Sequence, residues 1–327
     1  MSARKNGEDQ REAHPAAVAY ERRQRRNRRL DMAKTAAPII VFALIVVGYV
    51  TFSGKHGNTG SAAGAPNMSA TSTSSCFAGE AGCGSMSAPY ADSPAAAWPD
   101  GAAGIVLPAV TAVGGFSSEA VSSDLALSKQ FVVDQSLIPA VLDQGATPAA
   151  MLSLMTPSSN FSGKIVSEIA VATQTNNPTN VFVRFDPKTS VLLATPKVSG
   201  TVTYSQVQAG TLQVDVSLKI AYALKKPDGS AWTRTVATLS DELQFFDGDG
   251  SYASAPGTVW PYLIGLTDYA GVECGFTGGF VEPQYLTAGG SSQPLSGAPV
   301  DPYATATAGP TPTVTPTISG CQPLSRI

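Results

Sequence analysis

Two neighbouring carboxylates are the first residues in this chain that suggest acid–base chemistry. Asp241 and Glu242 lie in a run of alternating apolar and polar residues, a pattern that predicts a β-strand. Adjacent strand residues point to opposite faces, so the two carboxylates do not form a glycosidase-type pair without help from another segment. We interpret them as candidate acidic pocket residues, with Asp241 on the apolar side.

A second acidic cluster, DGDGS, begins at Asp247 and ends at Ser251. Its oxygen ligands stand at alternating positions, as in a calcium loop. The sixth position is Tyr252 where an EF-hand has Gly, and the twelfth is Thr258 where it has Glu. An Asp-Gly turn after a strand is the favoured interpretation, and we predict neither a metal nor another cofactor.

Histidine occurs only at His14 and His56. The long region after His56 therefore has no imidazole for Ser-His-Asp or Cys-His catalysis, nor for an H-E-x-x-H zinc site. No S-x-x-K spacing occurs in it either. The sequence predicts a non-catalytic binding or scaffold module. The alternative is a ligand-binding or hydrolytic domain that uses acidic residues on a concave sheet face.

Aromatic residues are concentrated between positions 232 and 285, where Gly and Pro are also frequent. Such rings either form a binding surface or close the open end of a sheet. The candidate binding residues are Trp232, Tyr252, Trp260, Tyr262 and Tyr269.

Charge is distributed unevenly along the chain. Residues 1–34 carry 10 Lys/Arg and 5 Asp/Glu, which leaves 11 and 19 for the remainder. The first segment has a net charge of +5 and the rest of −8. Nucleic-acid binding draws its affinity from clustered cations, so this acidic remainder argues against nucleic acid as a partner.

An uncharged apolar segment follows the basic tail of residues 1–35. The 17 residues 36–52, AAPIIVFALIVVGYVTF, are close to the length that a membrane-spanning helix needs. Seven Lys/Arg lie just before it, at 22–34, which predicts a cytoplasmic N-terminus and an exported C-terminal part. We favour a permanent anchor in the lipid bilayer over a cleaved export signal, because the small residues at 61–63 lie too far beyond the apolar run.

Low-complexity segments flank the predicted domain, residues 104–290. Residues 53–103 are rich in Ser, Ala and Gly, and residues 291–327 in Pro and Thr; we predict a disordered stalk and a tail.

The predicted stalk and the predicted tail each contain cysteine. Cys76 and Cys83 are close enough in sequence for a small disulfide loop, with metal binding as the less favoured reading. Cys274 with Cys321 is the other predicted pair, two free thiols being the alternative.

Within the predicted domain, helical patterns precede strand patterns. Ser117 or Ser118 is expected to cap a helix, and a short helix is expected after Thr147-Pro148. Residues 211–246 alternate around the turn sequence KKPDGS, which predicts a long antiparallel hairpin. Weaker strand signals lie at 164–173, 179–185, 191–194 and 198–204. The predicted class is α+β, with helices packed on a curved antiparallel sheet.

The layout resembles that of single-pass, membrane-anchored, largely uncharacterised proteins of high-GC Gram-positive bacteria. The resemblance covers the basic tail, span, stalk and domain, and the stretch W-P-Y-L…D-Y-A-G-V-E-C-G-F from Trp260 to Phe276. The order of helices before a long curved sheet is similar to the NTF2-like cone of bitopic scaffold proteins in conjugative-transfer machines. Because recognisable catalytic groups are absent, we expect the exported domain to bind another envelope protein or itself.

Overall fold

The computed structural model describes residues 78, 83–247, 257–273, 277–285, 300–304 and 327. All of them belong to the second of two compact units, Ser72–Ile327. Among the described residues, no helix has both the length and the apolarity to cross a membrane. The predicted span at 36–52 lies outside them.

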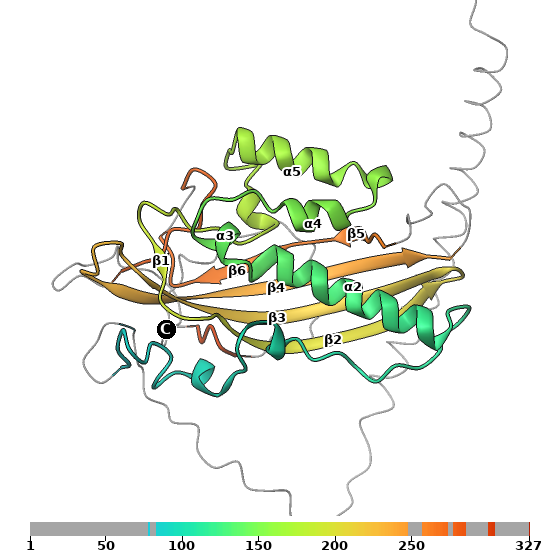
Figure 1. Cartoon of the computed structure of the whole chain (residues 1–327), viewed down its shortest axis with the longest axis horizontal. Coiled ribbons are helices and arrows are strands. Elements are labelled where there is room, and N and C mark those ends of the chain that lie inside the picture. The colour runs from blue at the N-terminus through green and yellow to red at the C-terminus, as the bar shows by residue number, and fades with distance from the viewer. Residues whose placement is uncertain (1–77, 79–82, 248–256, 274–276, 286–299, 305–326) are drawn as a thin grey trace, which may run out of the picture. The chain divides into compact units, whose positions relative to one another are not determined.

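A long antiparallel hairpin forms the centre of a six-stranded sheet. Its strands are β3 (Thr211–Lys225) and β4 (Trp232–Phe246), as the alternating pattern predicted. The outer strands flank this hairpin (Figure 1). β1 (Val191–Leu192) and β2 (Lys197–Gln208) pair with β3, whereas β5 (Trp260–Leu263) and β6 (Leu266–Ala270) pair with β4.

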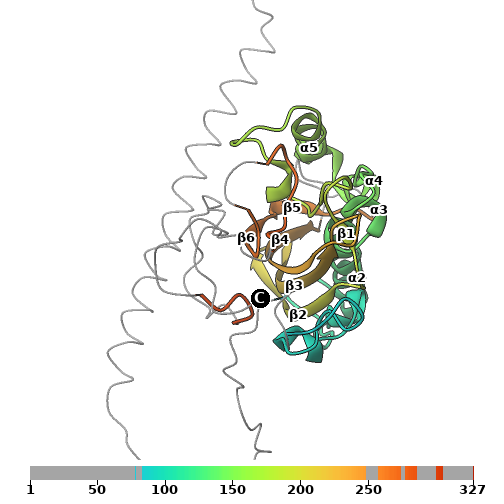
Figure 2. The same cartoon turned by 90° about the vertical axis from the view of Figure 1, so that its left-hand side faces the viewer.

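Helices cover one face of this sheet, as Figure 2 shows. The longest, α2 (Ser118–Ser136), begins after the predicted cap: the Ser117 Oγ accepts a hydrogen bond from the Ala120 N–H. Apolar residues of α2 pack against the inward residues of β3 and β4 in one buried cluster. The coarse α+β prediction is therefore confirmed. The shorter helices are α3 (Pro139–Leu142), α4 (Ala149–Leu154) and α5 (Phe161–Ala170), with 3-10 turns η1 (Pro94–Ala97), η2 (Gly101–Gly104), η3 (Pro157–Ser159) and η4 (Pro178–Asn180).

Two strand predictions were wrong. Residues 164–173 alternate weakly, yet most of them belong to α5, whose buried Ile165 and Glu168 are separated by helical spacing. Residues 179–185 form η4 and an irregular segment with one isolated bridge at Phe185. In both segments the spacing of the apolar residues does not fit one pattern alone. Packing against the sheet therefore decided the conformation.

The opposite face of the sheet is covered in part by segments that the sequence assigned to the stalk and tail. Tyr90 and Ala95 form a second buried cluster with Ala221, Val236 and Tyr303, among others. The Tyr90 hydroxyl accepts a hydrogen bond from the Ala223 N–H at 3.1 Å. The predicted stalk boundary at 103 is therefore too late, because Tyr90 and its neighbours dock this segment on the sheet.

Candidate functional site

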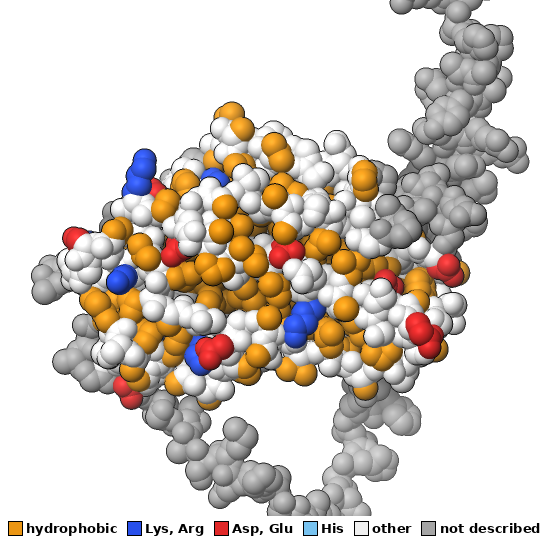
Figure 3. Space-filling view, viewed as in Figure 1, with side chains coloured by type: hydrophobic (Ala, Val, Ile, Leu, Met, Phe, Trp, Pro, Cys, Tyr) orange, Lys and Arg blue, Asp and Glu red, His pale blue; other side chains and the backbone are white. Residues whose placement is uncertain are grey.

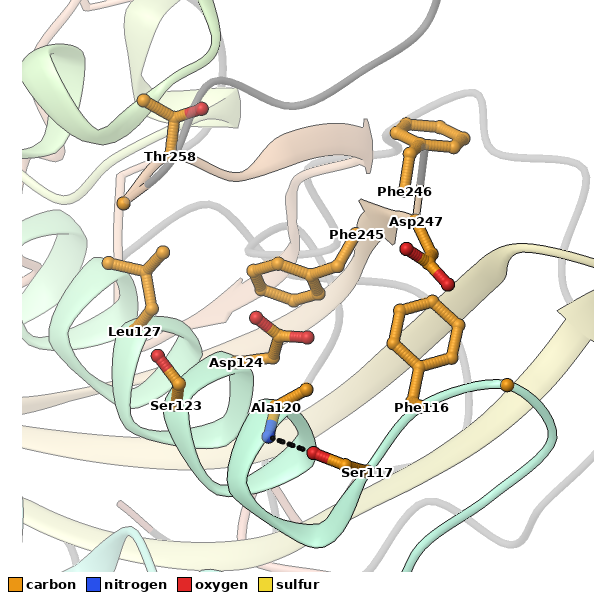
Figure 4. A pocket seen from close by; sticks show the side chains of 12 residues that line it. Phe116, Ser117, Ala120, Ser123, Asp124, Leu127, Phe245, Phe246, Asp247 and Thr258 are labelled. Carbon is orange, nitrogen blue, oxygen red and sulfur yellow. Dashed lines mark hydrogen bonds between the residues drawn. The ribbon is translucent and has the colours of Figure 1, made fainter. Parts of the chain in front are cut away.

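A cleft of about 460 Å³ lies between the start of α2 and the end of β4 (Figure 4). The first turns of α2 form one wall, and the last residues of β4 form the opposite wall. Its lining combines phenylalanine rings with two carboxylates. The lining residues are Gly115, Phe116, Ser117, Ala120, Ser123, Asp124, Leu127, Phe245, Phe246, Asp247, Gly257 and Thr258.

The local sequence determines where the side chains that line the cleft lie. Phe116 immediately precedes the helix cap and is buried, so it fixes how the chain enters α2. Phe245 and Phe246 are successive residues of a strand, and they therefore point to opposite faces. Phe245 is buried in the main core, whereas Phe246 is only partly buried at the mouth of the cleft. The floor is consequently apolar and the rim aromatic.

Asp124 is the chemically distinctive residue of the cleft. It lies in the second turn of α2 and lines the cleft together with Phe245 (Figure 4). Burial raises the pKa of this carboxyl to about 6. Within the described part of the chain, no side chain forms an ion pair or a hydrogen bond with it; Ser128 binds only the backbone carbonyl of Asp124.

The aromatic surface continues beyond the cleft. Phe246 packs edge-on against Trp260 of β5, with ring centroids 5.8 Å apart. Tyr262, two residues further along the same strand, is 60% exposed. An aromatic rim of Phe246, Trp260 and Tyr262 therefore extends from the cleft along β5.

The predicted aromatic residues do not form one patch. Trp260 and Tyr262 lie on β5 near the cleft, but Trp232 and Tyr269 are buried elsewhere. The Tyr269 hydroxyl donates a hydrogen bond to the Thr179 carbonyl at 2.6 Å, as expected of a structural tyrosine. Tyr252 lies outside the described residues.

Asp241 is buried in the core and is only 1% exposed. Its Oδ1 accepts hydrogen bonds from the Gly265 N–H at 3.0 Å and from the Gln135 Nε2 at 3.4 Å. Burial raises the pKa of this carboxyl to about 7, and these two donors oppose the shift. Asp241 lines neither the cleft described above nor a second cleft of about 270 Å³ beside α5.

Glu242 points to the opposite face, as alternation predicted. Across the hairpin it pairs with Asp215. Burial raises the pKa of the Glu242 carboxyl, and the negative charge of Asp215 raises it further. Asp215 thus supplies Glu242 with a second carboxylate from another segment. Asp241 does not lie on this face of the sheet.

The remaining predicted features are described only in part. Cys83 is disulfide-bonded, and its partner lies outside the described residues. Cys76, Cys274 and Cys321 also lie outside them, as does the acidic cluster after Asp247. No group of three or more metal-ligating side chains occurs in the regions that the structure describes.

Sequence reasoning missed Phe116 and Asp124. The cleft joins residues about 120 positions apart, and only the packing of α2 on the sheet brings them together. Asp124 belongs to no recognised motif, so the sequence did not single it out. Its position one helical turn before Ser128, with apolar Leu125 and Phe131 on the buried side, gave the sole signal.

No family model, curated protein or solved structure matches this chain.

Proposed function

We propose that this domain is a non-catalytic binding module of the cell envelope, held outside the cell membrane by a single-pass anchor with a cytoplasmic N-terminus. We further propose that it binds another envelope protein through the cleft between α2 and β4. The long sheet crossed by α2 (Figure 1) supports the proposed similarity to an NTF2-like cone. The anchor rests on the apolar segment 36–52 and its basic flank.

One observation carries the binding proposal: the aromatic rim continues from the cleft onto β5. A small-molecule site encloses most of its ligand, whereas this cleft is open and its rim extends to the exposed Tyr262. Aromatic residues surrounding a pocket are typical of the centre of protein–protein interfaces. The arrangement therefore favours a polypeptide partner that inserts a side chain and covers the rim.

The hydrolytic alternative has weaker support. Asp241 has a raised pKa, as a catalytic acid often has, yet it is enclosed by Gln135 and Gly265. Glu242 and Asp215 share an open face on neighbouring strands. A buried acid that lines neither cleft is better explained as a core carboxyl.

The test uses two neighbouring serines of α2. Ser123 lines the cleft and Ser122 does not, and both are exposed. The full-length chain is purified from membranes of its own cells, as wild type, Ser123→Trp and Ser122→Trp. We expect a specific protein partner with the wild type and with Ser122→Trp, and its loss with Ser123→Trp. Equal recovery from both variants contradicts the proposal, and recovery of a second copy of the chain identifies self-association.

A further inference from the structure

The cleft contains a negative charge that the described protein does not neutralise. The Asp124 carboxylate is partly removed from water, lies by an apolar floor, and has no ion-pair partner among the described residues. Desolvating a carboxylate without a partner is unfavourable. A group that binds this carboxylate would therefore gain more than it would at an exposed acid.

The start of α2 does not make the cleft an anion site. The N-terminus of a helix attracts anions because its first N–H groups lack partners. Here the Ser117 Oγ accepts the Ala120 N–H, and the backbone N–H of Glu119 and the Ser117 and Ser118 hydroxyls lower the pKa of the Glu119 carboxyl. These groups are already occupied by the chain itself.

The surrounding charge has the same sign as Asp124. Asp247 lies at the other wall of the cleft, and the lining includes neither Lys nor Arg. Figure 3 shows acidic side chains and no basic ones among the described residues at the end of this face where α2 begins. The described basic residue on α2, Lys129, donates to the Ile105 carbonyl at 2.8 Å, away from the cleft. The cleft is thus complementary to a cation.

We propose that the group which the partner inserts into this cleft is a Lys or Arg side chain that pairs with Asp124. This inference rests on the proposed function and names the anchor residue of the partner. A charge-assisted hydrogen bond to a partly buried carboxylate is stronger than a neutral one. The phenylalanine rings that line the same cleft add a favourable surface for a cation, above all for a guanidinium group.

The test uses a probe that carries a single charge. Nα-acetyl-arginine amide is compared with Nα-acetyl-citrulline amide, which has nearly the same shape and no charge. Binding to the full-length chain in detergent micelles is followed by NMR of the Leu127 and Thr258 methyl groups, which line the cleft. The same titrations are made with Asp124→Asn, and at pH 7.5 and pH 5.

We expect the arginine probe to shift both methyl signals of the wild type at pH 7.5. The citrulline probe and the Asp124→Asn variant should each bind at least about tenfold more weakly, because a charged hydrogen bond is lost. The arginine probe should also weaken at pH 5, where Asp124 is largely protonated. Asp124→Asn should stay folded, because it removes a desolvated charge.

Equal binding of the two probes overturns the inference, as does unchanged binding to Asp124→Asn or the absence of any shift in the wild type. These outcomes are separate from those of the proposed function. If Ser123→Trp abolishes partner capture while the arginine probe does not bind, the cleft is still the binding site but its anchor is not a cation. If Ser123→Trp does not affect capture of the partner, the proposal that the cleft binds a protein partner is itself wrong.

Discussion

The side chains of Asp241 and Gln135 meet inside the core, where Asp241 Oδ1 lies 3.4 Å from Gln135 Nε2. This contact joins β4 to α2. The second carboxylate oxygen, Oδ2, and the Gln135 Oε1 have no hydrogen-bond partner. Both unpaired atoms are acceptors when Asp241 is ionised, so neither can satisfy the other. A proton on the carboxyl removes the buried negative charge.

The first prediction concerns this proton. The pKa of Asp241 is about 7 in the folded protein and about 3.9 in an unfolded chain. A raised folded pKa gives stability that is fully present below about pH 4 and is lost as the pH rises through about 7. The difference corresponds to a loss on the order of 3 to 4 kcal/mol. We expect the unfolding temperature to fall between pH 5 and pH 8.

Asp241→Asn tests this directly, because its amide keeps the shape and is neutral at every pH. The variant should unfold at a higher temperature than the wild type at pH 8, and its pH dependence should be smaller. Glu242→Gln, on the open face, is the matched control and should change the slope less. Parallel curves for wild type and Asp241→Asn would show that Asp241 is ionised in the core.

The second prediction uses two glycines of the sheet. Gly200 has φ +152°, and a Cβ there would lie 2.1 Å from the Ser217 carbonyl oxygen. Gly229 has φ +71° in the hairpin turn, with nothing within 4 Å of the added atom. Gly200→Ala should lower the free energy of unfolding by more than about 2 kcal/mol, and Gly229→Ala by about 1 kcal/mol from backbone strain alone. Chemical denaturation measures both, and equal losses would contradict the close approach of β2 and β3.

The third prediction concerns the segment that covers the outer face. The Tyr90 hydroxyl accepts from the Ala223 N–H and lies 3.1 Å from the carbonyl oxygens of Thr195 and Ala221. Tyr90→Phe leaves these buried groups unsatisfied and should destabilise the domain by about 1 to 3 kcal/mol. Tyr262→Phe, at an exposed tyrosine, should have almost no effect on denaturation. Similar small effects at both sites would mean that residues 83–103 do not dock firmly.

The fourth prediction is the partner of Cys83. We expect Cys76, because a short loop closes easily in an oxidising compartment. Peptide mapping without reduction should show Cys76 linked to Cys83, and Cys274 to Cys321. Reduction should lower the unfolding temperature, since closing a loop of this size contributes about 2 to 3 kcal/mol in the chain-entropy account. A link from Cys83 to Cys274 or Cys321 would refute this connectivity.

The sequence predicted the parts of the fold that have a strong local pattern. The hairpin 211–246 alternates over many residues and has a distinctive turn, and Ser117 is a favourable helix cap. Residues 83–103 were misassigned because their composition is that of a linker, and Tyr90 reveals its role only through Ala221 and Ala223 on β3. The short strands β5 and β6 were also missed, since Gly and Pro surround them.

The candidate site was less predictable than the fold. Asp241 was correctly placed on the apolar side and Glu242 on the other, but no local pattern shows that Asp241 is enclosed. Trp260 and Tyr262 were selected as aromatic residues, and the structure brings Trp260 against Phe246, a residue that lines the cleft. Asp124 became significant only when the fold brought it and Phe245 into the lining of one cleft.

The central claim is that the cleft between α2 and β4 receives a protein partner, and cross-linking in living cells tests it most directly. A photo-reactive benzophenone residue is placed at position 123 or, as control, at position 122 of the full-length chain. The proposed function predicts one cross-linked protein species from position 123 that is absent from position 122. The same species from both positions, or none from position 123, would contradict it.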